Sequence, residues 1–511
     1  MATKQDLKEK VLAPIIEAGF NAYFVGGCVR DSLLGIKPHD YDIATDATPK
    51  DIRNIFDRFS NVSENSEPFG VTMPLIKICD SYEEIEIATL RKDITKGRHP
   101  KVEFTNLISE DAARRDFTMN AIYEDIDGQI IDPTGGISDI NNKVLRFVGK
   151  MEDRLDEDPL RLFRALRFLS KTGFAPAFSK SDFHAIATKL LETNRFDEVS
   201  KERQLKELEG IFGGKHFDIV FDELFWASLI PEVIGMRPYI DGLMEVKQSF
   251  RWHAEGAIIR TKDGTIKQVT CENDLKDFAE LRYNGYADFH TILTMEKMFE
   301  VLNEFGVEDT HKRFVMMVAA FCHDFGKVKA YKVNAHKHNV FEVNGIKIDE
   351  TLPSLKDHDI YGKDDAYNFC KSLGMINKES ALVATLTERH MRGHRLFETK
   401  DKYKVFSFVK YKHFDDLLLL IRADERACIK TIEDEWIPID KVLEQPLVKE
   451  VMAMEKPTPI VNGKFLIDNI GMKPSPIFKK IIDKSYRFQI NHNILNDEIE
   501  KMIKYVKNFE I

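Results

Sequence analysis

The sequence lacks the features that would place the protein outside the ordinary globular class. It has no low-complexity tract and no short-period repeat, and its 27 glycines and 18 prolines are neither enriched nor clustered, which excludes a fibrous or disordered chain. No apolar run is long enough to cross a bilayer, and the first ten residues are polar and charged, unlike the apolar core of a signal peptide. We therefore expect a cytoplasmic protein without a membrane partner.

Cysteine is also scarce, and basic residues do not outnumber acidic ones. The six cysteines are scattered and form no CxxC pair: Cys28, Cys79, Cys271, Cys322, Cys370 and Cys428. This pattern argues against a disulfide framework and a thiolate zinc site, so we expect reduced packing residues. Because the formal net charge is −10, contact with a nucleic acid must come from local basic stripes rather than from the overall field.

The chain is long enough for several domains, since 511 residues exceed what one hydrophobic core usually organises. Its first part mixes short β-branched and aromatic runs with helical stretches, which indicates an α/β domain. Helical periodicity follows, beginning with an apolar stripe of Leu162, Phe163, Leu166 and Leu169. The sequence predicts an α/β head at 1–150, a helical neck and body at 151–235, a helical domain at 236–445 with a polar insertion near 257–284, and a helical tail at 446–511.

Acidic residues follow a glycine turn in the head. Asp40 and Asp42 in the run DYD would stand side by side on a strand, because residues i and i+2 project from the same face. Glu86, between Ile85 and Ile87 on a second predicted strand, could complete a three-carboxylate cluster. Magnesium prefers carboxylate and phosphate oxygens, and two metals about 4 Å apart can activate an attacking hydroxyl and stabilise a leaving pyrophosphate.

The turn itself fits phosphate binding. Gly26 and Gly27 follow the apolar run AYFV and let the backbone approach a triphosphate, with Arg30 as a charged clamp on the following helix. DxD occurs often by chance in an acidic protein, and a Gly-Gly pair is usually a simple turn. Taken together and in this order, the glycines, the carboxylates and the arginine favour a nucleotide site.

Successive segments resemble, in order, the motifs of class II CCA-adding enzymes and bacterial poly(A) polymerases: GGCVRD with DYD, EIATLR, GRHPKVEF, RRDFTMNA, DPTGGISDI, EDPLRLFRALRF and SKERQLKEL. The resemblance covers about 24–208 and implies a nucleotidyltransferase palm as the head. It implies that Asp40 and Asp42 bind Mg²⁺, that Glu86 is the third carboxylate, and that Gly26, Gly27, Arg30 and Arg115 contact the nucleotide. The segment 92–104 resembles the flexible loop that complete CCA-adding members use when they switch to A.

The run EDPLR contains residues expected to select the base of the incoming nucleotide. On a helix Asp158 and Arg161 are i and i+3 neighbours, and Arg164 and Arg167 continue the row. The alternative is a helix start, with Asp158 near the cap and a solvated arginine face. Within the motif series the row resembles the family's amino-acid template: a carboxylate accepts from the exocyclic amine of C or A while a guanidinium donates to the ring nitrogen, and U and G present the opposite polarity.

Downstream residues resemble the ligand series of HD-domain phosphohydrolases. The series is His290, His323, Asp324 and Asp424, with His358, His390 and His394 as further candidates. Imidazoles with carboxylates suit a divalent transition metal or magnesium, which can activate water against a phosphoester; the resemblance does not identify the metal. In such relatives a stretch like WHAEG runs almost directly into the first HD histidine, whereas here the insertion intervenes. The sequence therefore leaves open whether His290 joins the site.

The function expected from these features is CCA addition to tRNA. The tRNA 3′-hydroxyl would attack the α-phosphate of CTP twice and then that of ATP, with release of pyrophosphate, and no stable protein partner is implied. One alternative is a poly(A) polymerase, which would share nearly every motif. Another is an RNA-end phosphohydrolase in which the HD domain is the main enzyme and the head only binds RNA.

Overall fold

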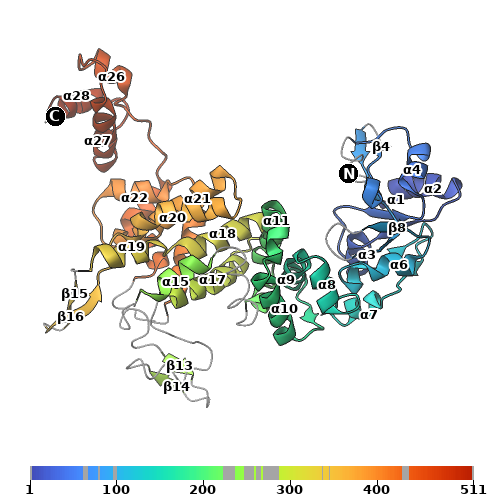
Figure 1. The fold of residues 1–511 in the computed structure, drawn as a ribbon. Helices are drawn as coiled ribbons and strands as arrows, with labels where there is room; N and C mark the ends of the chain where they lie inside the picture. The colour runs from blue at the N-terminus through green and yellow to red at the C-terminus, as the bar shows by residue number, and fades with distance from the viewer. Residues whose placement is uncertain are drawn as a thin grey trace. The chain divides into compact units, whose positions relative to one another are not determined.

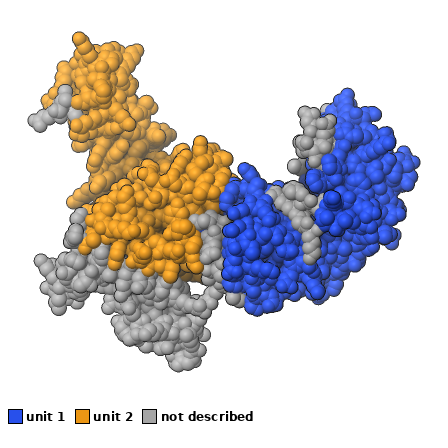
Figure 2. All heavy atoms as spheres, viewed as in Figure 1, with its two compact units in different colours: residues 1–236 blue, residues 237–511 orange. Residues whose placement is uncertain are grey.

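The computed structural model describes residues 3–60, 67–78, 81–95, 101–221, 236–246, 258–260, 266–268, 287–335, 338–343, 346–428 and 437–508. These residues fall into two compact units, residues 1–236 and residues 237–511 (Figure 2). The first unit contains the sheet and the helices that follow it, whereas the described part of the second is mainly helical (Figure 1).

The head of unit 1 is built on a six-stranded mixed sheet with the strand order β10-β9-β1-β2-β6-β3. Its strands are β1 (Ala22–Val25), β2 (Asp42–Thr45), β3 (Val71–Thr72), β6 (Ile87–Thr89), β9 (Tyr123–Glu124) and β10 (Ile130–Ile131). β2 pairs antiparallel with β1, with Val25 opposite Asp42, and parallel with β6, with Ile43 opposite Ile87. The end of β1 and the beginnings of β2 and β6 therefore meet at one edge of the sheet.

Short helices and hairpins surround this sheet. They are α1 (Lys4–Leu7), η1 (Lys8–Leu12), α2 (Ala13–Glu17), α3 (Gly27–Leu33), α4 (Pro49–Ile55), η2 (Glu67–Phe69), the hairpin of β4 (Leu75–Ile78) and β5 (Ser81–Glu84), the hairpin of β7 (Arg91–Asp93) and β8 (Val102–Phe104), α6 (Ile108–Ala113), η3 (Thr118–Asn120), α7 (Gly136–Asn141), and β11 (Val144–Leu145) paired with β12 (Ala175–Pro176). The predicted flexible loop corresponds to the β7–β8 hairpin, and its residues 96–100 lie outside the described residues.

The helices of the neck confirm the apolar stripe predicted there. They are α8 (Met151–Glu157), α9 (Leu160–Thr172), α10 (Lys180–Glu192), η4 (Arg195–Glu198), α11 (Lys201–Phe212) and α12 (Phe217–Val220). Leu162, Phe163, Leu166 and Leu169 of α9 are at most 1% exposed. Asp158 and Arg161 do not lie on one helix, because α8 ends at Glu157, Asp158 is extended and α9 begins at Leu160. Pro159 disfavours helical geometry at the residue before it, which separates the two helices.

The described part of unit 2 consists mainly of helices. They are α15 (Arg237–Met244), α17 (Ala287–Glu304), α18 (Thr310–Cys322), α19 (Gly326–Val333), α20 (His358–Ser372), α21 (Asn377–Arg389), η6 (His390–Arg392), η7 (His394–Leu396), α22 (Lys402–Val409), α23 (Phe414–Arg426), α24 (Ile439–Leu443) and α25 (Pro446–Ala453), with the hairpins β13 (Ile258–Arg260)–β14 (Ile266–Gln268) and β15 (His338–Val343)–β16 (Ile346–Pro353). Most of the predicted insertion at 257–284 lies outside the described residues.

The end of the chain forms a small helical group with its own core. Its helices are α26 (Gly463–Asp468), α27 (Ile477–Asn491) and α28 (Ile499–Lys507), and Phe465, Leu466, Ile481, Met502 and Val506 are among the buried residues that pack together there. Across the part of the chain that the structure describes, no helix is both long and apolar enough to cross a membrane.

The DPTGG segment leads into α7, which packs against the turn η3. The Asp132 carboxylate accepts hydrogen bonds from the backbone N–H groups of Gly135, Gly136 and Ile137 at 3.0, 2.9 and 2.9 Å, which begins α7. A Cβ on Gly136 would lie 2.2 Å from the carbonyl oxygen of Thr118. The missing side chain therefore lets α7 lie directly against η3.

Gly136→Ala should destabilise unit 1 because its methyl group would overlap the Thr118 backbone. We expect a loss of about 1–3 kcal/mol or more, as for other overpacked sites, measured by thermal or urea unfolding followed by circular dichroism. Gly135→Asn is the matched control: Gly135 has φ +83° but nothing within 4 Å of its Cβ position, and Asn tolerates that conformation. Equal stability of the two variants would contradict the close-packing interpretation.

Candidate functional site

The three acidic residues predicted in the head lie at one edge of the sheet. Asp42 is the first residue of β2, Asp40 precedes the strand, and Glu86 precedes β6. The Ile43 N–H donates to the Glu86 carbonyl at 3.2 Å, which places Glu86 beside Asp42 on the neighbouring parallel strand. Asp40 is not on the strand itself, so the expected side-by-side pair is one residue on the strand and one on the loop that leads into it.

The glycine turn reaches this edge from β1. Gly26 has φ +74°, and a Cβ there would lie 3.6 Å from Arg115 Nη1, 3.7 Å from the Asn120 carbonyl oxygen and 3.9 Å from Asp42 Oδ2. Gly26 has the conformation that favours glycine. The turn, one carboxylate and one guanidinium therefore meet within a few ångströms, which is the arrangement that a triphosphate with a divalent cation requires.

Mutual repulsion is visible in the electrostatics of these carboxylates. Burial and the neighbouring charge of Asp40 raise the pKa of Asp42, while Arg115 and Arg30 act in the opposite direction. Partial desolvation, followed by the charges of Asp42 and Asp40, raises the pKa of Glu86. The edge thus has more negative charge than its two arginines neutralise, and a cation would relieve this. The three carboxylates are not among the described groups whose donor atoms all lie within 4.8 Å of one another.

Two arginines beside the turn are held by acidic partners. Arg115 donates to Asp111 from Nε and Nη2 at 3.1 and 3.0 Å, which leaves Nη1 directed toward Gly26. Burial alone would raise the pKa of Asp111, but Arg115, Arg114 and Tyr123 hold it at about 2. Arg30 is buried and donates to Asp31 and, from Nη1 at 2.7 Å, to Asn120. Both guanidiniums therefore have fixed orientations at the edge of the site.

Asp158 and Arg161 lie close in sequence but have separate partners. One Asp158 oxygen accepts from the N–H of Leu160, the first residue of α9, at 3.0 Å, and the other lies 3.7 Å from Arg203. Arg161 donates to Glu157 at 2.5 Å and to the carbonyl oxygens of Arg154 and Arg114. Asp158 therefore lies next to the N-cap residue Pro159, as the alternative predicted, and Arg161 is held by Glu157 rather than by Asp158.

Arg164 and Arg167 face the head and α11 instead of solvent. Arg164 lies 2.5 Å from Asp116 Oδ2 and 3.9 Å from Glu207, and Arg167 donates to Glu207 at 2.5 Å. Their side chains are 32% and 23% exposed, so each guanidinium keeps a surface that a ligand could reach. The solvated arginine face of the alternative interpretation is not observed, because the neighbouring carboxylates bind both side chains.

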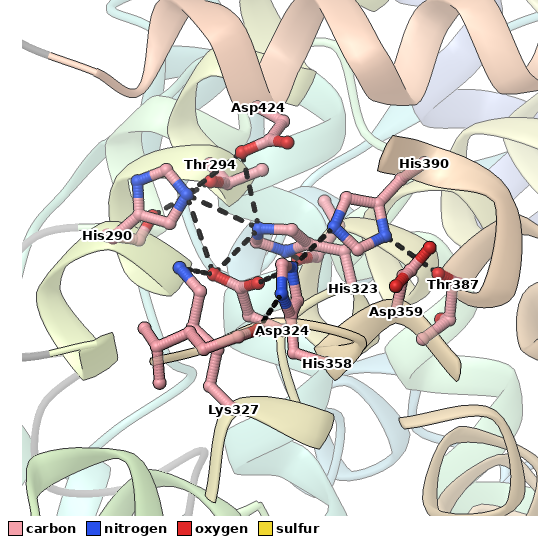
Figure 3. Close-up of polar contacts among 12 residues, drawn as sticks. His290, Thr294, His323, Asp324, Lys327, His358, Asp359, Thr387, His390 and Asp424 are labelled. Carbon is pink, nitrogen blue, oxygen red and sulfur yellow. Dashed lines mark hydrogen bonds and ion pairs between the residues drawn. The ribbon is translucent and has the colours of Figure 1, made fainter. Parts of the chain in front are cut away.

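In unit 2 the predicted HD residues converge from several helices (Figure 3). Among the described residues, two groups have donor atoms within 4.8 Å of one another: His290 with His323 and Asp424, and Asp324 with His358 and His390. All six are at most 8% exposed. The groups adjoin, because His323 Nε2 lies 3.2 Å from Asp324 Oδ2.

His290 belongs to this site in spite of the insertion before it. Its Nε2 lies 2.9 Å from Asp424 Oδ1, 3.4 Å from His323 Nε2 and 3.6 Å from Asp324 Oδ2. The insertion ends before α17, and this helix carries His290 into the cluster. The question that the sequence left open is therefore answered in favour of His290.

The imidazoles are oriented as metal ligands are. The Nδ1 atoms of His323, His358 and His390 lie 2.7, 2.8 and 2.7 Å from the backbone carbonyls of Ala320, Leu355 and Thr387, so each Nδ1–H donates outward. The Nε2 atoms of His358 and His390 then face each other at 3.2 Å. Burial, first of all, lowers the pKa of both rings, that of His390 to about 4. Two neutral rings in this tautomer present two lone pairs to each other, which a cation between them would stabilise.

The charges of the cluster also favour a bound divalent cation. Burial alone would lower the pKa of His323, but Asp324 and Asp424 raise it to about 10. Without a metal a proton on His323 would therefore partly balance the two buried carboxylates; a divalent cation bound to either donor group would supply positive charge in its place. Four imidazoles and two carboxylates form a mixed nitrogen and oxygen donor set. Such a set suits a divalent transition metal, whereas sites made only of oxygen donors suit Mg²⁺ or Ca²⁺.

One member of the predicted set lies outside these groups, and one neighbour was not predicted. His394 lies in η7, with Nδ1 3.5 Å from Glu425 Oε1, and belongs to neither group. Lys327, which is 6% exposed, lies with Nζ 2.5 Å from Asp324 Oδ2. The run HDFGK contains the signal that could have identified it, because Lys327 follows Asp324 by one helical turn.

Comparisons with known proteins confirm the resemblance expected from the motifs. The family model of the Poly A polymerase head domain matches residues 22–146. A CCA-adding enzyme of Bacillus subtilis (strain 168) is 39% identical over 228 residues, which are 44% of this chain and 54% of that protein. A CCA-adding enzyme of Streptococcus pneumoniae (strain CGSP14) is 36% identical over 232 residues, 45% of this chain and 53% of that protein. The chain thus spans about half the length of the curated relatives it matches.

Solved structures extend the likeness over nearly the whole chain. The crystal structure of the Bacillus stearothermophilus CCA-adding enzyme in complex with CTP matches with a TM-score of 0.56 and 21% identity, over 98% of this chain and 96% of that one. The Thermotoga maritima CCA-adding enzyme complexed with tRNA matches with a TM-score of 0.52 and 17% identity, over 99% and 96%. At these identities the likeness shows a common fold. Residues 22–146 thus match the Poly A polymerase head domain, in a chain that has the fold of CCA-adding enzymes.

Proposed function

We propose that the protein is a cytoplasmic tRNA nucleotidyltransferase that adds C, C and A to the tRNA 3′ end from CTP and ATP. The observation that carries this proposal is the meeting of the Gly26 turn, Asp42 and Arg115 within 4 Å at one sheet edge, with Asp40 and Glu86 beside them. The relatives named as CCA-adding enzymes support it. We propose the domain limits predicted from the sequence: a head at 1–150, a neck and body at 151–235, an HD domain at 236–445 and a helical tail at 446–511.

Each group at the edge has a part in the proposed reaction. Divalent cations, for which Mg²⁺ suits the oxygen donors of Asp40 and Asp42, would supply Lewis acidity toward the attacking hydroxyl and the leaving pyrophosphate. Gly26 and Gly27 let the backbone approach the phosphates, and Arg30 and Arg115 offset their charge. Glu86 adds negative charge beside Asp42 and so strengthens the attraction for a cation.

A poly(A) polymerase would use the same edge, and the products separate the two activities. We expect the protein to extend tRNA that lacks its 3′ end by two C residues and one A, and then to stop. Incubation with each nucleotide singly and together, followed by sequencing of the products, measures this. Repeated addition of A to an unrelated RNA from ATP alone would identify a poly(A) polymerase instead.

Asp42→Asn should reduce CTP and ATP addition by about 10²–10³-fold or more, because it removes a negative ligand of the proposed metals while keeping the side-chain shape. Steady-state kinetics at saturating Mg²⁺ measures the loss, and tRNA binding and the unfolding temperature should stay close to those of the unmodified protein. Asp46→Asn is the control: Asp46 follows the other end of β2, where it accepts from Asn21. Near-normal turnover of Asp42→Asn would sink the metal assignment.

Selection of the base is proposed to depend on the hydrogen-bond polarity of Asp158 and Arg161. Asp158→Asn keeps an oxygen that can accept from the Leu160 N–H, so the cap on α9 is retained. Its other oxygen is replaced by an NH₂ group, which is a donor. Two donors then face each other when C or A is bound, whereas the carbonyl groups of U and G can accept from the new NH₂. We expect the preference for CTP over UTP to fall by roughly 5- to 150-fold, the range of one good base contact.

Asp158→Ala separates this effect from stability, since it removes both the cap and the acceptor. Both variants should lose base discrimination, but only Asp158→Ala should also unfold at a lower temperature. If Asp158→Asn kept strict use of C and A while Asp158→Ala was merely less stable, Asp158 would act only as a helix cap.

We propose a second activity for unit 2: metal-dependent hydrolysis of phosphoesters at RNA ends, with 2′,3′-cyclic phosphates as the substrate class. The specific observation is the convergence of four imidazoles and two carboxylates on two adjoining donor groups, which are buried and oriented by backbone carbonyls. Bound divalent cations would supply an activated water, and Lys327 places a positive charge next to Asp324, where a phosphate could bind. A damaged 3′ end would then be repaired before C and A are added.

His323→Ala and Asp324→Ala should each abolish release of phosphate or opening of the cyclic ester, because both remove ligands at the centre of the cluster. CTP and ATP addition by the head should continue. The assay uses the full chain with Mg²⁺, Mn²⁺, Ni²⁺ and Co²⁺ in turn, and His413→Ala, which changes a histidine bound to Asp416 outside the cluster, should retain activity. No hydrolysis by the unmodified protein with any of the four ions would leave unit 2 with a structural function only.

A further inference from the structure

Asn120 lies between two arginines that are proposed to contact the nucleotide. It is the last residue of η3 and is 7% exposed. Its Oδ1 accepts from Arg30 Nη1 at 2.7 Å, and its Nδ2 donates to Asp116 Oδ1 at 3.1 Å. The orientation of the amide is fixed by chemistry, because a guanidinium only donates and a carboxylate only accepts.

The contact continues through Asp116 into the neck. Asp116 Oδ2 accepts from Arg164 Nε at 2.7 Å and lies 2.5 Å from Arg164 Nη2. Burial alone would raise the pKa of Asp116, but Arg164 and Asn120 hold it at about 2, so the carboxylate stays charged. Arg30 of α3 and Arg164 of α9 are thus joined through one amide and one carboxylate.

Both guanidiniums also lie over one aromatic ring. Their Cζ atoms are 5.1 Å (Arg30) and 5.7 Å (Arg164) from the centroid of Phe168, which is 3% exposed. Arg167 lies closer still, with its Cζ atom 4.3 Å from the same centroid, and the ring attracts each of these cations without neutralising it. Phe168 limits where the guanidiniums can move, but an apolar ring cannot fix their rotation; the hydrogen bonds of Asn120 and Asp116 do that.

We propose that Asn120 is a positioning residue for the incoming nucleotide. It sets the orientation of Arg30 relative to Arg164, so that guanidiniums from the head and from the neck are presented to the nucleotide together. The inference rests on the proposed nucleotidyltransferase function. It explains why an amide stands at this position: a carboxylate would face Asp116 with like charge, and an apolar side chain would remove one hydrogen bond from each of two buried charged groups.

The backbone of Asn120 adds a contact that substitution of its side chain would not remove. Its carbonyl oxygen accepts from Arg115 Nη1 at 3.4 Å and lies 3.7 Å from the Cβ position of Gly26. Arg115 should therefore remain in place in a side-chain variant. A change in nucleotide binding would then report on Arg30 and Arg164 and not on collapse of the glycine turn.

The test is steady-state kinetics of Asn120→Ala and Arg30→Lys, alone and combined, in the full-length protein. Arg30→Lys keeps the charge but loses the Nη1 donor to Asn120. We expect each single variant to raise KM for CTP and ATP by about 10- to 100-fold, the range for hydrogen bonds to charged groups, with KM for tRNA unchanged within about twofold. The combined variant should be close to Arg30→Lys alone, because Arg30→Lys already breaks the contact that Asn120→Ala removes.

Thr118→Val is the matched structural control. Thr118 is the first residue of the same turn and is 2% exposed, and its hydroxyl donates to Asp139 at 2.7 Å rather than to a partner near the nucleotide. Thr118→Val should lower the unfolding temperature and leave KM for the nucleotides and for tRNA unchanged. If Asn120→Ala does not fold, Asn120→Ser replaces it, with the same KM rise expected because a hydroxyl is too short to reach Arg30 and Asp116 together.

The outcomes separate this inference from the proposed function. Folded Asn120 variants with unchanged nucleotide KM, or additive effects of Asn120→Ala and Arg30→Lys, would overturn the positioning role while C and A addition stands. Absence of addition by the unmodified protein would overturn the proposed function, and with it this inference.

Discussion

The pairing of β2 between β1 and β6 is the constraint on which the head depends. Antiparallel pairing with β1 sets Asp42 opposite Val25, so the turn at Gly26 begins beside that carboxylate, and parallel pairing with β6 brings Glu86 next to it. A shift of either register by one residue would turn these side chains to the other face of the sheet. Burial, together with the neighbouring like charges, raises the pKa of Asp42 and Glu86, and a bound cation would reverse this.

Charged side chains continue from this edge into the neck as an alternating series. Arg30, Asn120, Asp116, Arg164, Glu207 and Arg167 follow one another through direct contacts. Each arginine is matched by a carboxylate or an amide, so the guanidiniums are ordered before a ligand arrives and lose little freedom when they bind it. The motifs RRDFTMNA, EDPLRLFRALRF and SKERQLKEL are thus parts of one network, and the head and neck contribute jointly to it.

Unit 2 gathers a different set of donor groups for a proposed divalent cation. Its centre is buried and rich in imidazoles, with the outer nitrogens of three rings committed to backbone carbonyls. This arrangement turns the lone pairs inward, where they oppose one another unless a proton or a metal lies between them. The head uses oxygen donors suited to Mg²⁺, whereas unit 2 uses a mixed donor set suited to a transition metal, so the proposed activities could respond to different ions.

The sequence by itself determined the kinds of residues and their local elements. The strand at Ala22–Val25 and the buried stripe of α9 follow from short-range pattern, because periodicity and turn chemistry act within a few residues. The set of HD residues was predicted from a family resemblance. Tertiary structure alone decided other partners: Arg161 binds Glu157 and not Asp158, and His290 reaches the HD cluster across the insertion. Partner choice depends on distances between residues far apart in the chain, or on which of several nearby acids a guanidinium meets after packing. Neither is encoded in spacing along the sequence.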